Sequence, residues 1–270
     1  MLRKLLKHEF RATGRVMLPM YLILLVTAVG SNLAGRGMLD RQSDILNILG
    51  VLIVMAFGIA ICGALLMSFV LMIQRFYKNL LQDEGYLMFT LPVSVHQHVW
   101  SKLIVSAVWF AATILAIIAA SLVVAYDVSF LREFFDVLRW FFEGLQKLKI
   151  SETLNLTAYL AEFAVLLFLS LAAFALQFYA ALAAGHSRAN HKMLWSVAWF
   201  FGFQFALQFA GSLLMVYLNQ IHFFGHLNWD LTPTASIHVG LLMAIGCVIV
   251  YGAIFYAVTT FFLKKHLNLE

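Results

Sequence analysis

The middle of the chain contains the run Phe163-Ala164-Val165-Leu166-Leu167-Phe168-Leu169, in which every side chain is apolar. A membrane-spanning β-strand alternates apolar and polar side chains, because one face meets lipid and the other meets the lumen. This run does not alternate, so it predicts a helix that is apolar on every side. The apolar stretch extends over Leu154–Ala184, which exceeds the roughly 20 residues that a helix needs to cross a bilayer.

Five other stretches are apolar and long enough to cross a membrane. They are Val16–Leu33, with Pro19 in its first turn, Asn47–Ile73, Leu103–Tyr126, Leu194–Leu218 and Ile237–Phe262. Hydrophobic residues make up 63% of the chain and charged residues 11%, against roughly a half and a quarter in soluble domains. This composition excludes a soluble globule and a disordered chain. We therefore predict an all-α, polytopic membrane protein, with six transmembrane helices in a single domain over residues 1–270.

The basic residues predict which ends of the spans face the cytoplasm. Six spans place both termini and two loops on one side, and that side carries 12 of the 18 lysines and arginines. They are Arg3, Lys4, Lys7, Arg11, Arg15, Arg75, Lys78, Lys102, Arg188, Lys192, Lys264 and Lys265. Because cytoplasmic loops are enriched in these residues, both termini are predicted to be cytoplasmic. No basic patch with exposed aromatic residues occurs in a soluble segment, so nucleic acid is not an expected partner.

Two amphipathic helices are predicted outside the spans. Residues 1–15 place apolar and basic side chains on opposite faces, as in a helix that lies in the lipid interface; anchoring of the first span by positive charge is the other interpretation. Residues 127–153 form a predicted extracytoplasmic helix with a phenylalanine-rich face that is too large to leave in water. That face is expected to contact lipid or other helices of the chain, or else to gate a substrate or dock a partner.

The predicted cytoplasmic loop 74–102 contains a short apolar segment between two helices. Span two is expected to continue to about Leu81, and Asp83-Glu84-Gly85 to end it. The apolar segment Tyr86–Leu91 follows and is stopped by Pro92, which disfavours helix at the residue before it. A short apolar element on this side of the membrane needs a partner groove.

The run Asp83-Glu84-Gly85-Tyr86-Leu87-Met88-Phe89-Thr90-Leu91-Pro92-Val93-Ser94, followed by Lys102, resembles the loop after the second helix in permeases of ABC-2 type transporters. The match is to the small, six-helix bacterial kind, and the spans, the cytoplasmic termini and the basic first helix extend it over most of the chain. In that family the loop forms a coupling helix that docks on a separate ATPase subunit. The resemblance implies that apolar side chains fill a groove of the ATPase, while acidic ones meet basic residues at its rim. The docking residues so implied are Asp83, Glu84, Gly85, Tyr86, Leu87, Phe89, Leu91 and Pro92.

The resemblance implies a permease subunit of an ATP-driven exporter in the bacterial plasma membrane. Its substrate would be hydrophobic or amphipathic, such as a peptide antibiotic, a lipid or a drug. The chain contains no G-x-x-x-x-G-K-[ST] motif, so it is not expected to be an enzyme or to carry a cofactor. ATP and Mg²⁺ would bind a cytoplasmic ABC ATPase subunit. A second permease copy or a homologue would complete the membrane unit.

A few polar residues within the spans are candidates for the translocation path. Glu162 is the one acid inside a predicted span, and Gln177 lies on roughly the same face of that helix. Gln204 and Gln208 form an i,i+4 pair on span five. Intramembrane carboxylates often mark substrate or ion pathways. Hydrogen bonding between helices is the other interpretation of the glutamines.

No catalytic or metal-binding residues are predicted. The histidines lack a third ligand of suitable type nearby in the sequence, and no G-x-S-x-G motif occurs. A secondary transporter or channel with no ATPase partner is the main alternative function, although it would favour internal repeats and mid-membrane charge. An intramembrane enzyme would need paired acids or histidines at helix centres.

Overall fold

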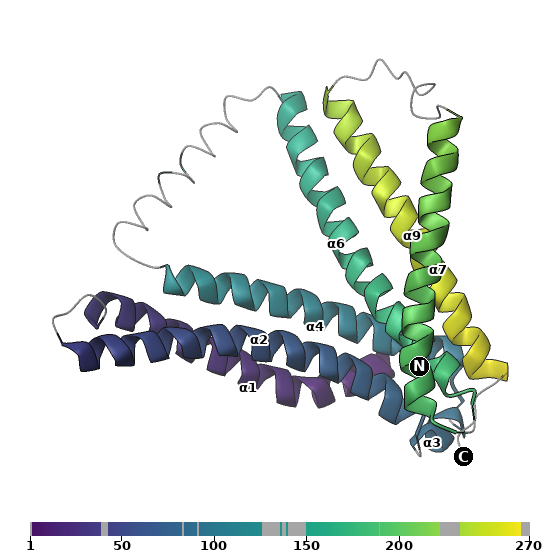
Figure 1. The fold of residues 1–270 in the computed structure, drawn as a ribbon, viewed down its shortest axis with the longest axis horizontal. Helices are drawn as coiled ribbons and strands as arrows, with labels where there is room; N and C mark the ends of the chain where they lie inside the picture. The colour runs from purple at the N-terminus through teal and green to yellow at the C-terminus, as the bar shows by residue number, and fades with distance from the viewer. Residues whose placement is uncertain are drawn as a thin grey trace. The chain divides into compact units, whose positions relative to one another are not determined.

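The computed structural model describes residues 2–38, 43–82, 84–90, 92–125, 136, 139, 150–188, 190–221 and 233–265. Within them, all regular structure is α-helical and forms seven helices (Figure 1). They are α1 (Leu2–Gly37), α2 (Asp44–Leu80), α3 (Glu84–Thr90), α4 (Val95–Val124), α6 (Ile150–Gly185), α7 (Lys192–Gln220) and α9 (Pro233–Lys265). All except α3 are long and apolar enough to cross a membrane. The predicted all-α class and the six candidate spans are confirmed, while the sidedness of the spans stays a prediction.

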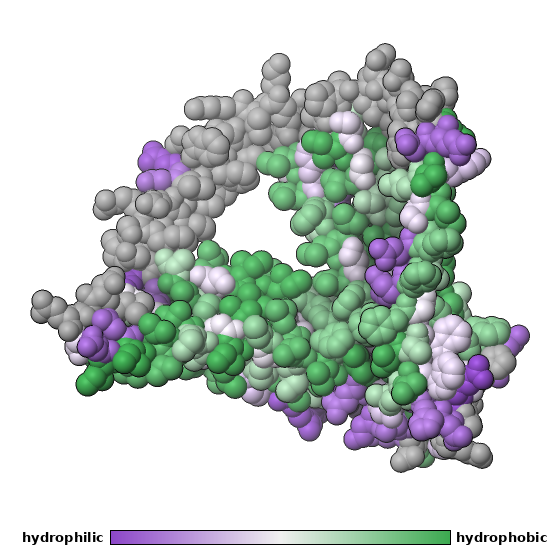
Figure 2. Space-filling model, viewed as in Figure 1, coloured by the Kyte–Doolittle hydropathy of each residue, from purple (hydrophilic) through white to green (hydrophobic). Residues whose placement is uncertain are grey.

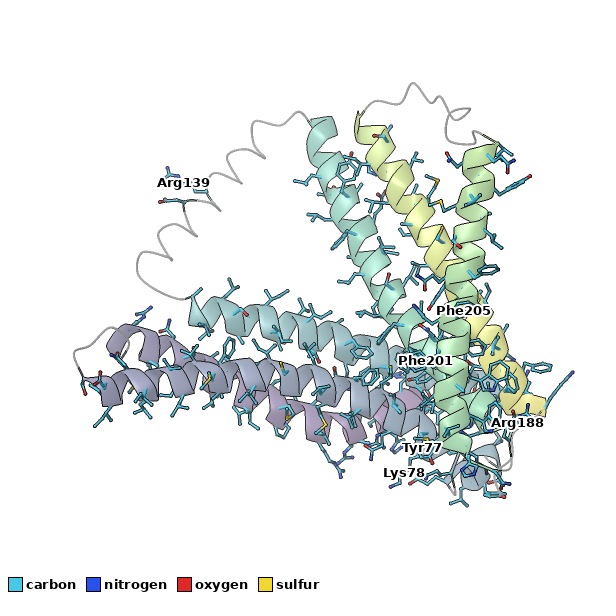
Figure 3. The ribbon with its side chains drawn as sticks, viewed as in Figure 1. Tyr77, Lys78, Arg139, Arg188, Phe201 and Phe205 are labelled. Carbon is cyan, nitrogen blue, oxygen red and sulfur yellow. The ribbon has the colours of Figure 1, made fainter. Side chains whose placement is uncertain are left out.

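The surfaces of the long helices are those of a protein in lipid. Figure 2 shows hydrophobic side chains along the helices and most hydrophilic ones near helix ends. Helix α7 buries only Ser196 among its described residues, and Phe201 and Phe205 project from it with 65% and 72% of their surface exposed (Figure 3). Soluble proteins rarely expose apolar surfaces of this extent. These surfaces indicate a multi-pass membrane protein.

Helix α1 is continuous from Leu2 to Gly37 and contains Pro19 in its interior. Pro19 therefore does not lie in the first turn of a helix. The reason is that a proline removes only one backbone hydrogen bond of the helix, and no capping residue ends the helix before it. The predicted interfacial segment over residues 1–15 and the start of the span at Val16 stay predictions, since one continuous helix can contain both.

The chain packs as two compact units. One contains Met1–Met72 and Ile104–Leu156, and the other contains Ile73–Leu103 and Thr157–Glu270. The single transmembrane domain that the sequence predicts is not tested by this division. The predicted extracytoplasmic helix over 127–153 lies largely outside the described residues. Of it, the structure describes helical, exposed residues at Asp136 and Arg139 (Figure 3) and the first turn of α6.

Small side chains and polar contacts hold the first unit together. Leu24 and Ala28 of α1 pack with Ala60 of α2 and Ala120 of α4, and alanines allow the helix backbones to approach closely. The Nε1–H of Trp109 donates to Thr13 Oγ1 over 2.7 Å. In the same unit, the amide of Asn32 donates to the carbonyl of Val124 over 2.9 Å, which satisfies one of the unpaired carbonyls at the end of α4.

In the second unit, α2 and α6 are joined by a stacked pair of rings. Phe76 and Tyr179 are both fully buried, with ring centroids 4.1 Å apart and planes within 7° of parallel. Tyr77 meets the ring of His186 edge-on at 5.2 Å. The last turns of α2 and α6 are thereby fixed against each other at the base of α3.

The connection between α6 and α7 requires a glycine. A Cβ built on Gly185 would lie 2.6 Å from the Cα of Ser196 and closer still to its backbone nitrogen. Neither atom is the end of a flexible side chain, so any larger residue at 185 forces the start of α7 away from α6.

We expect Gly185→Ala to lower the midpoint of thermal unfolding of the detergent-solubilised chain, since overpacking costs about 1–3 kcal/mol. Gly202→Ala is the matched control, because nothing lies within 4 Å of a Cβ at that position and alanine favours a helix interior. An equal effect of both substitutions would contradict the close approach at Gly185.

Candidate functional site

The loop that the sequence singles out folds as expected from its residues. Helix α2 ends at Leu80, and α3 runs from Glu84 to Thr90, just before Pro92. The amide of Gly85 donates to the carbonyl of Gln82 over 2.7 Å, closing the turn between the two helices. Glu84 lies in the first turn of α3, where a carboxylate is favoured by the helix dipole.

A polar network ties α3 to the ends of α2 and α4. Asn79 is 5% exposed and Lys102 is 3% exposed. In the amide orientation that satisfies both ends, the Asn79 nitrogen donates to a carboxylate oxygen of Glu84 and to the Arg75 carbonyl, both over 3.3 Å. The Asn79 oxygen then accepts from the Lys102 ammonium over 2.9 Å. A buried amide therefore links Glu84 on α3 to a buried cation on α4.

A second contact to Glu84 adds little to this attachment. The Lys78 ammonium lies 3.7 Å from a Glu84 carboxylate oxygen, and the two side chains are 58% and 46% exposed. Exposed ion pairs are worth roughly 0–1 kcal/mol. Asn79, which is buried, is the stronger determinant of where α3 lies.

The outer surface of α3 is apolar. Tyr86 and Leu87 are 51% and 73% exposed, whereas Gly85 is buried. Of the other predicted docking residues, Pro92 is exposed, while Asp83, Leu91 and the side chain of Phe89 lie outside the described residues. The docking role of these residues stays a prediction.

A buried histidine lies just beyond the end of α6, against Tyr77 of α2. His186 is 1% exposed, and its Nδ1–H donates to the Leu182 carbonyl over 2.8 Å. Burial lowers the pKa of His186 below its ordinary value of 6.5, and the nearby charge of Lys192 lowers the pKa further, while the bond to Leu182 opposes both. The folded chain therefore holds this imidazole neutral at pH values where the unfolded chain binds a proton.

We expect stability to fall on acidification because of His186. Its contribution is fully present above pH about 6.5 and is lost as the pH drops towards the lowered pKa of the folded state. His186→Gln should reduce the difference in unfolding midpoint between pH about 7.5 and about 5.5. His191→Asn is the control, since His191 is exposed and has a left-handed backbone that asparagine tolerates. An unchanged pH dependence in the His186 variant would contradict the prediction.

Glu162, the acid predicted within a span, is paired across two helices. Its carboxylate oxygens lie 2.9 and 3.0 Å from Nδ1 of His238 on α9, and the two side chains are about one-fifth exposed. The ring of Tyr159 on α6 lies 4.2 Å from the His238 ring. The carboxylate is thus held by a neighbouring imidazole rather than facing lipid alone.

Gln177 joins three helices. Its amide nitrogen donates to Gln204 on α7 over 2.8 Å, and its oxygen accepts from the Tyr251 hydroxyl on α9 over 2.7 Å. Gln208 is exposed on α7. Hydrogen bonding between helices is therefore confirmed for Gln177 and Gln204, and a role in the translocation path stays a prediction for all four residues.

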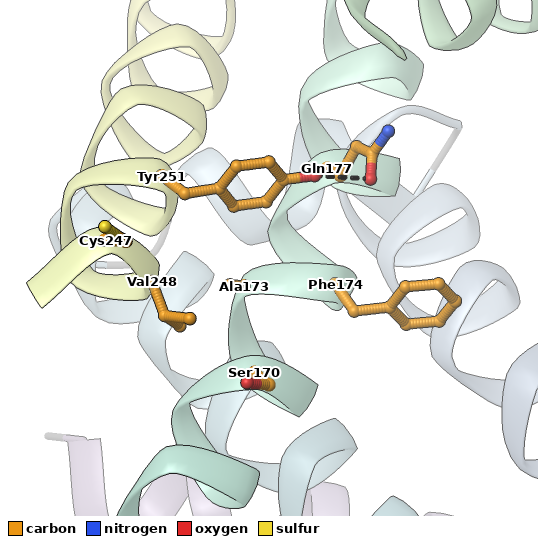
Figure 4. Close-up of a pocket in the computed structure, with 7 residues that line it drawn as sticks. All are labelled: Ser170, Ala173, Phe174, Gln177, Cys247, Val248 and Tyr251. Carbon is orange, nitrogen blue, oxygen red and sulfur yellow. Dashed lines mark hydrogen bonds between the residues drawn. The ribbon is translucent and has the colours of Figure 1, made fainter. Parts of the chain in front are cut away.

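A cavity of about 330 Å³ lies between α6 and α9, next to this network (Figure 4). Its wall is mostly apolar, and Gln177 and Tyr251 supply polar groups at one end (Figure 4). The lining residues are Ser170, Ala173, Phe174, Gln177, Cys247, Val248 and Tyr251. An apolar cavity with a few polar groups suits an amphipathic molecule.

Cys247 offers a direct probe of this cavity. In a Cys62→Ser variant we expect Cys247 to react with a water-soluble thiol reagent, because thiolate chemistry requires water at the sulfur. Cys62, the other cysteine, is also exposed but does not line the cavity, so it should react more slowly in the matched Cys247→Ser variant. Equal rates would show that the cavity is no wetter than the lipid-facing surface.

The sequence marks Glu162 and Gln177 as candidates but does not mark their hydrogen-bond partners. The structure shows that these partners are His238 and Tyr251. One signal was present for His238, since both it and Glu162 fall near the predicted outer ends of their spans. Nothing in the sequence marked Asn79 as the amide that contacts Glu84.

The described residues include no group of three or more histidines, cysteines or acids close enough to hold a metal ion. Comparison of the chain with family models, with curated proteins and with solved structures finds no match. The geometry of α3 and the cavity between α6 and α9 are therefore the features that bear on function.

Proposed function

We propose that the chain is the membrane-spanning permease subunit of an ATP-driven ABC exporter of the ABC-2 type. Its ATPase is a separate cytoplasmic subunit that docks on α3, and its substrate is hydrophobic or amphipathic. A second permease, identical or homologous, completes the membrane unit in the bacterial plasma membrane.

One observation carries this proposal: α3 combines an exposed apolar surface with a buried attachment. Tyr86 and Leu87 are available to a partner, while Glu84 is held through Asn79 to Lys102. A helix that merely covered the loop would not need a buried amide and a buried cation beneath it. A helix that receives force does, because the force must pass to α2 and α4.

The attachment supports a simple mechanism. Closure of the ATPase on ATP displaces α3, and the Asn79 network passes the displacement to the ends of α2 and α4. Packed helices respond to such a displacement as rigid bodies with discrete arrangements. The substrate is then exposed to one side of the membrane or the other.

We expect Leu87→Asp to abolish co-purification of the ATPase and stimulation of its activity. A charge in place of a 73% exposed leucine would have to be desolvated in the partner's groove. The Phe89→Asp change should have the same effect. The measurement is the yield of the associated ATPase after mild detergent extraction, with membrane insertion checked in parallel.

Ile221→Asp is the matched control, because Ile221 is an exposed apolar residue that follows the last turn of α7, on the predicted outer side. It receives the same charge and should leave the ATPase bound. Full recovery of the ATPase with the Leu87 variant would refute docking on α3.

A secondary transporter or channel is the second candidate, and the Glu162–His238 pair favours it. Paired ionisable groups inside membranes often belong to proton or ion pathways. The two functions differ in their energy source. Transport that persists with a hydrolysis-deficient ATPase and stops with a proton uncoupler would support the second candidate and exclude the first.

A further inference from the structure

Two lysines end α9, and neighbouring side chains hold each of them. The Nζ of Lys264 lies 2.8 Å from Nε2 of His96 at the start of α4. The Nζ of Lys265 lies 5.5 Å from the ring centroid of Phe261, a cation–π distance. Both lysines are exposed, so their charges are positioned and yet accessible.

Two polar contacts fix the ring of His96. An ammonium has only donors, so Nε2 of His96 accepts from Lys264. Nδ1 of His96 lies 2.6 Å from the Tyr256 hydroxyl. The ring of Trp100 lies 5.7 Å from that of Tyr256. Lys264 is thus oriented by a chain of side chains from α4 and α9, and it retains two N–H donors.

The described part of the chain places no carboxylate against these two charges. Among the described residues, neither Lys264 nor Lys265 forms an ion pair with an aspartate or a glutamate. Both lie at the predicted cytoplasmic end of a candidate span. Phe261 contacts Lys265, and Trp100 contacts Tyr256, the partner of His96. The rings of Phe261 and Trp100 are 47% and 46% exposed. Exposed aromatic rings at such a level are typical of the headgroup region of a bilayer.

We propose that Lys264, Lys265 and His96 form a binding site for the phosphate group of an anionic phospholipid. The two ammonium groups contact the phosphate, and His96 is a positioning residue that holds Lys264 towards it. Trp100 and Phe261 flank the headgroup, and the acyl chains follow the apolar surface of α9. A lipid is favoured over a soluble phosphate because the aromatic and apolar surfaces continue directly from the lysines. None of the residues of this site belongs to the proposed ATPase-docking set.

The test compares lipid binding to the full chain by native mass spectrometry in detergent, with phosphatidylglycerol and phosphatidylcholine as probes. We expect a preference for phosphatidylglycerol that Lys264→Gln and Lys265→Gln each weaken about fivefold, and together about 25-fold. Arg188→Gln with Lys192→Gln is the matched control, since it removes the same charge from the same predicted side and should change the preference much less. If the two double variants lost the preference for phosphatidylglycerol equally, net charge alone would explain the loss and the proposed site would be overturned.

Two further arms separate the remaining outcomes. His96→Ala should weaken phosphatidylglycerol binding and His96→Gln should restore it, because the glutamine oxygen accepts from Lys264 as Nε2 does; no loss with alanine would overturn the positioning role. Excess inorganic phosphate should leave the lipid bound. Complete displacement by phosphate would assign the site to a soluble anion and overturn the assignment to a lipid.

Discussion

Hydrocarbon offers no hydrogen bonds, so a polar group that a helix carries into the bilayer needs a partner within the protein. Gln177 shows the effect, since both ends of its amide are used, one by Gln204 and the other by Tyr251. The N–H of Trp109 on α4 likewise has an acceptor within the protein, the hydroxyl of Thr13 on α1. These polar side chains therefore lie where helices meet.

The same solvent removes the hydrophobic force that would press helices together in water, so close packing must supply the contact. Alanines do this in the first unit, where Ala28, Ala60 and Ala120 meet. In the second unit the contact comes from stacked rings, Phe76 on Tyr179, and from the absence of a side chain at Gly185. These sites are where a small change of volume is felt most.

The elements were predictable because their signals are local. Long apolar runs define the six spans, and the residues before Tyr86 and after Thr90 define α3. Pro19 lies inside a longer helix than the sequence predicts, because a change from basic to apolar residues reports a change of solvent and not the end of a helix. The pairing of Glu162 with His238 spans 76 residues, and no local pattern encodes which helices are neighbours. The role of Asn79 was not predictable either, because an asparagine near a helix end usually indicates a cap or a turn.

Helices α6 and α9 run parallel, and two polar contacts between them have nearly the same sequence offset, 76 residues at Glu162–His238 and 74 at Gln177–Tyr251. The two contacts therefore lie along one interface between α6 and α9. Sliding α6 along α9 by one residue, about 1.5 Å, strains both contacts at once. The interface therefore resists sliding. Tilting one helix away from the other at one end strains one contact and leaves the other intact. The interface between α6 and α9 therefore resists sliding more than it resists a tilt that opens it at one end.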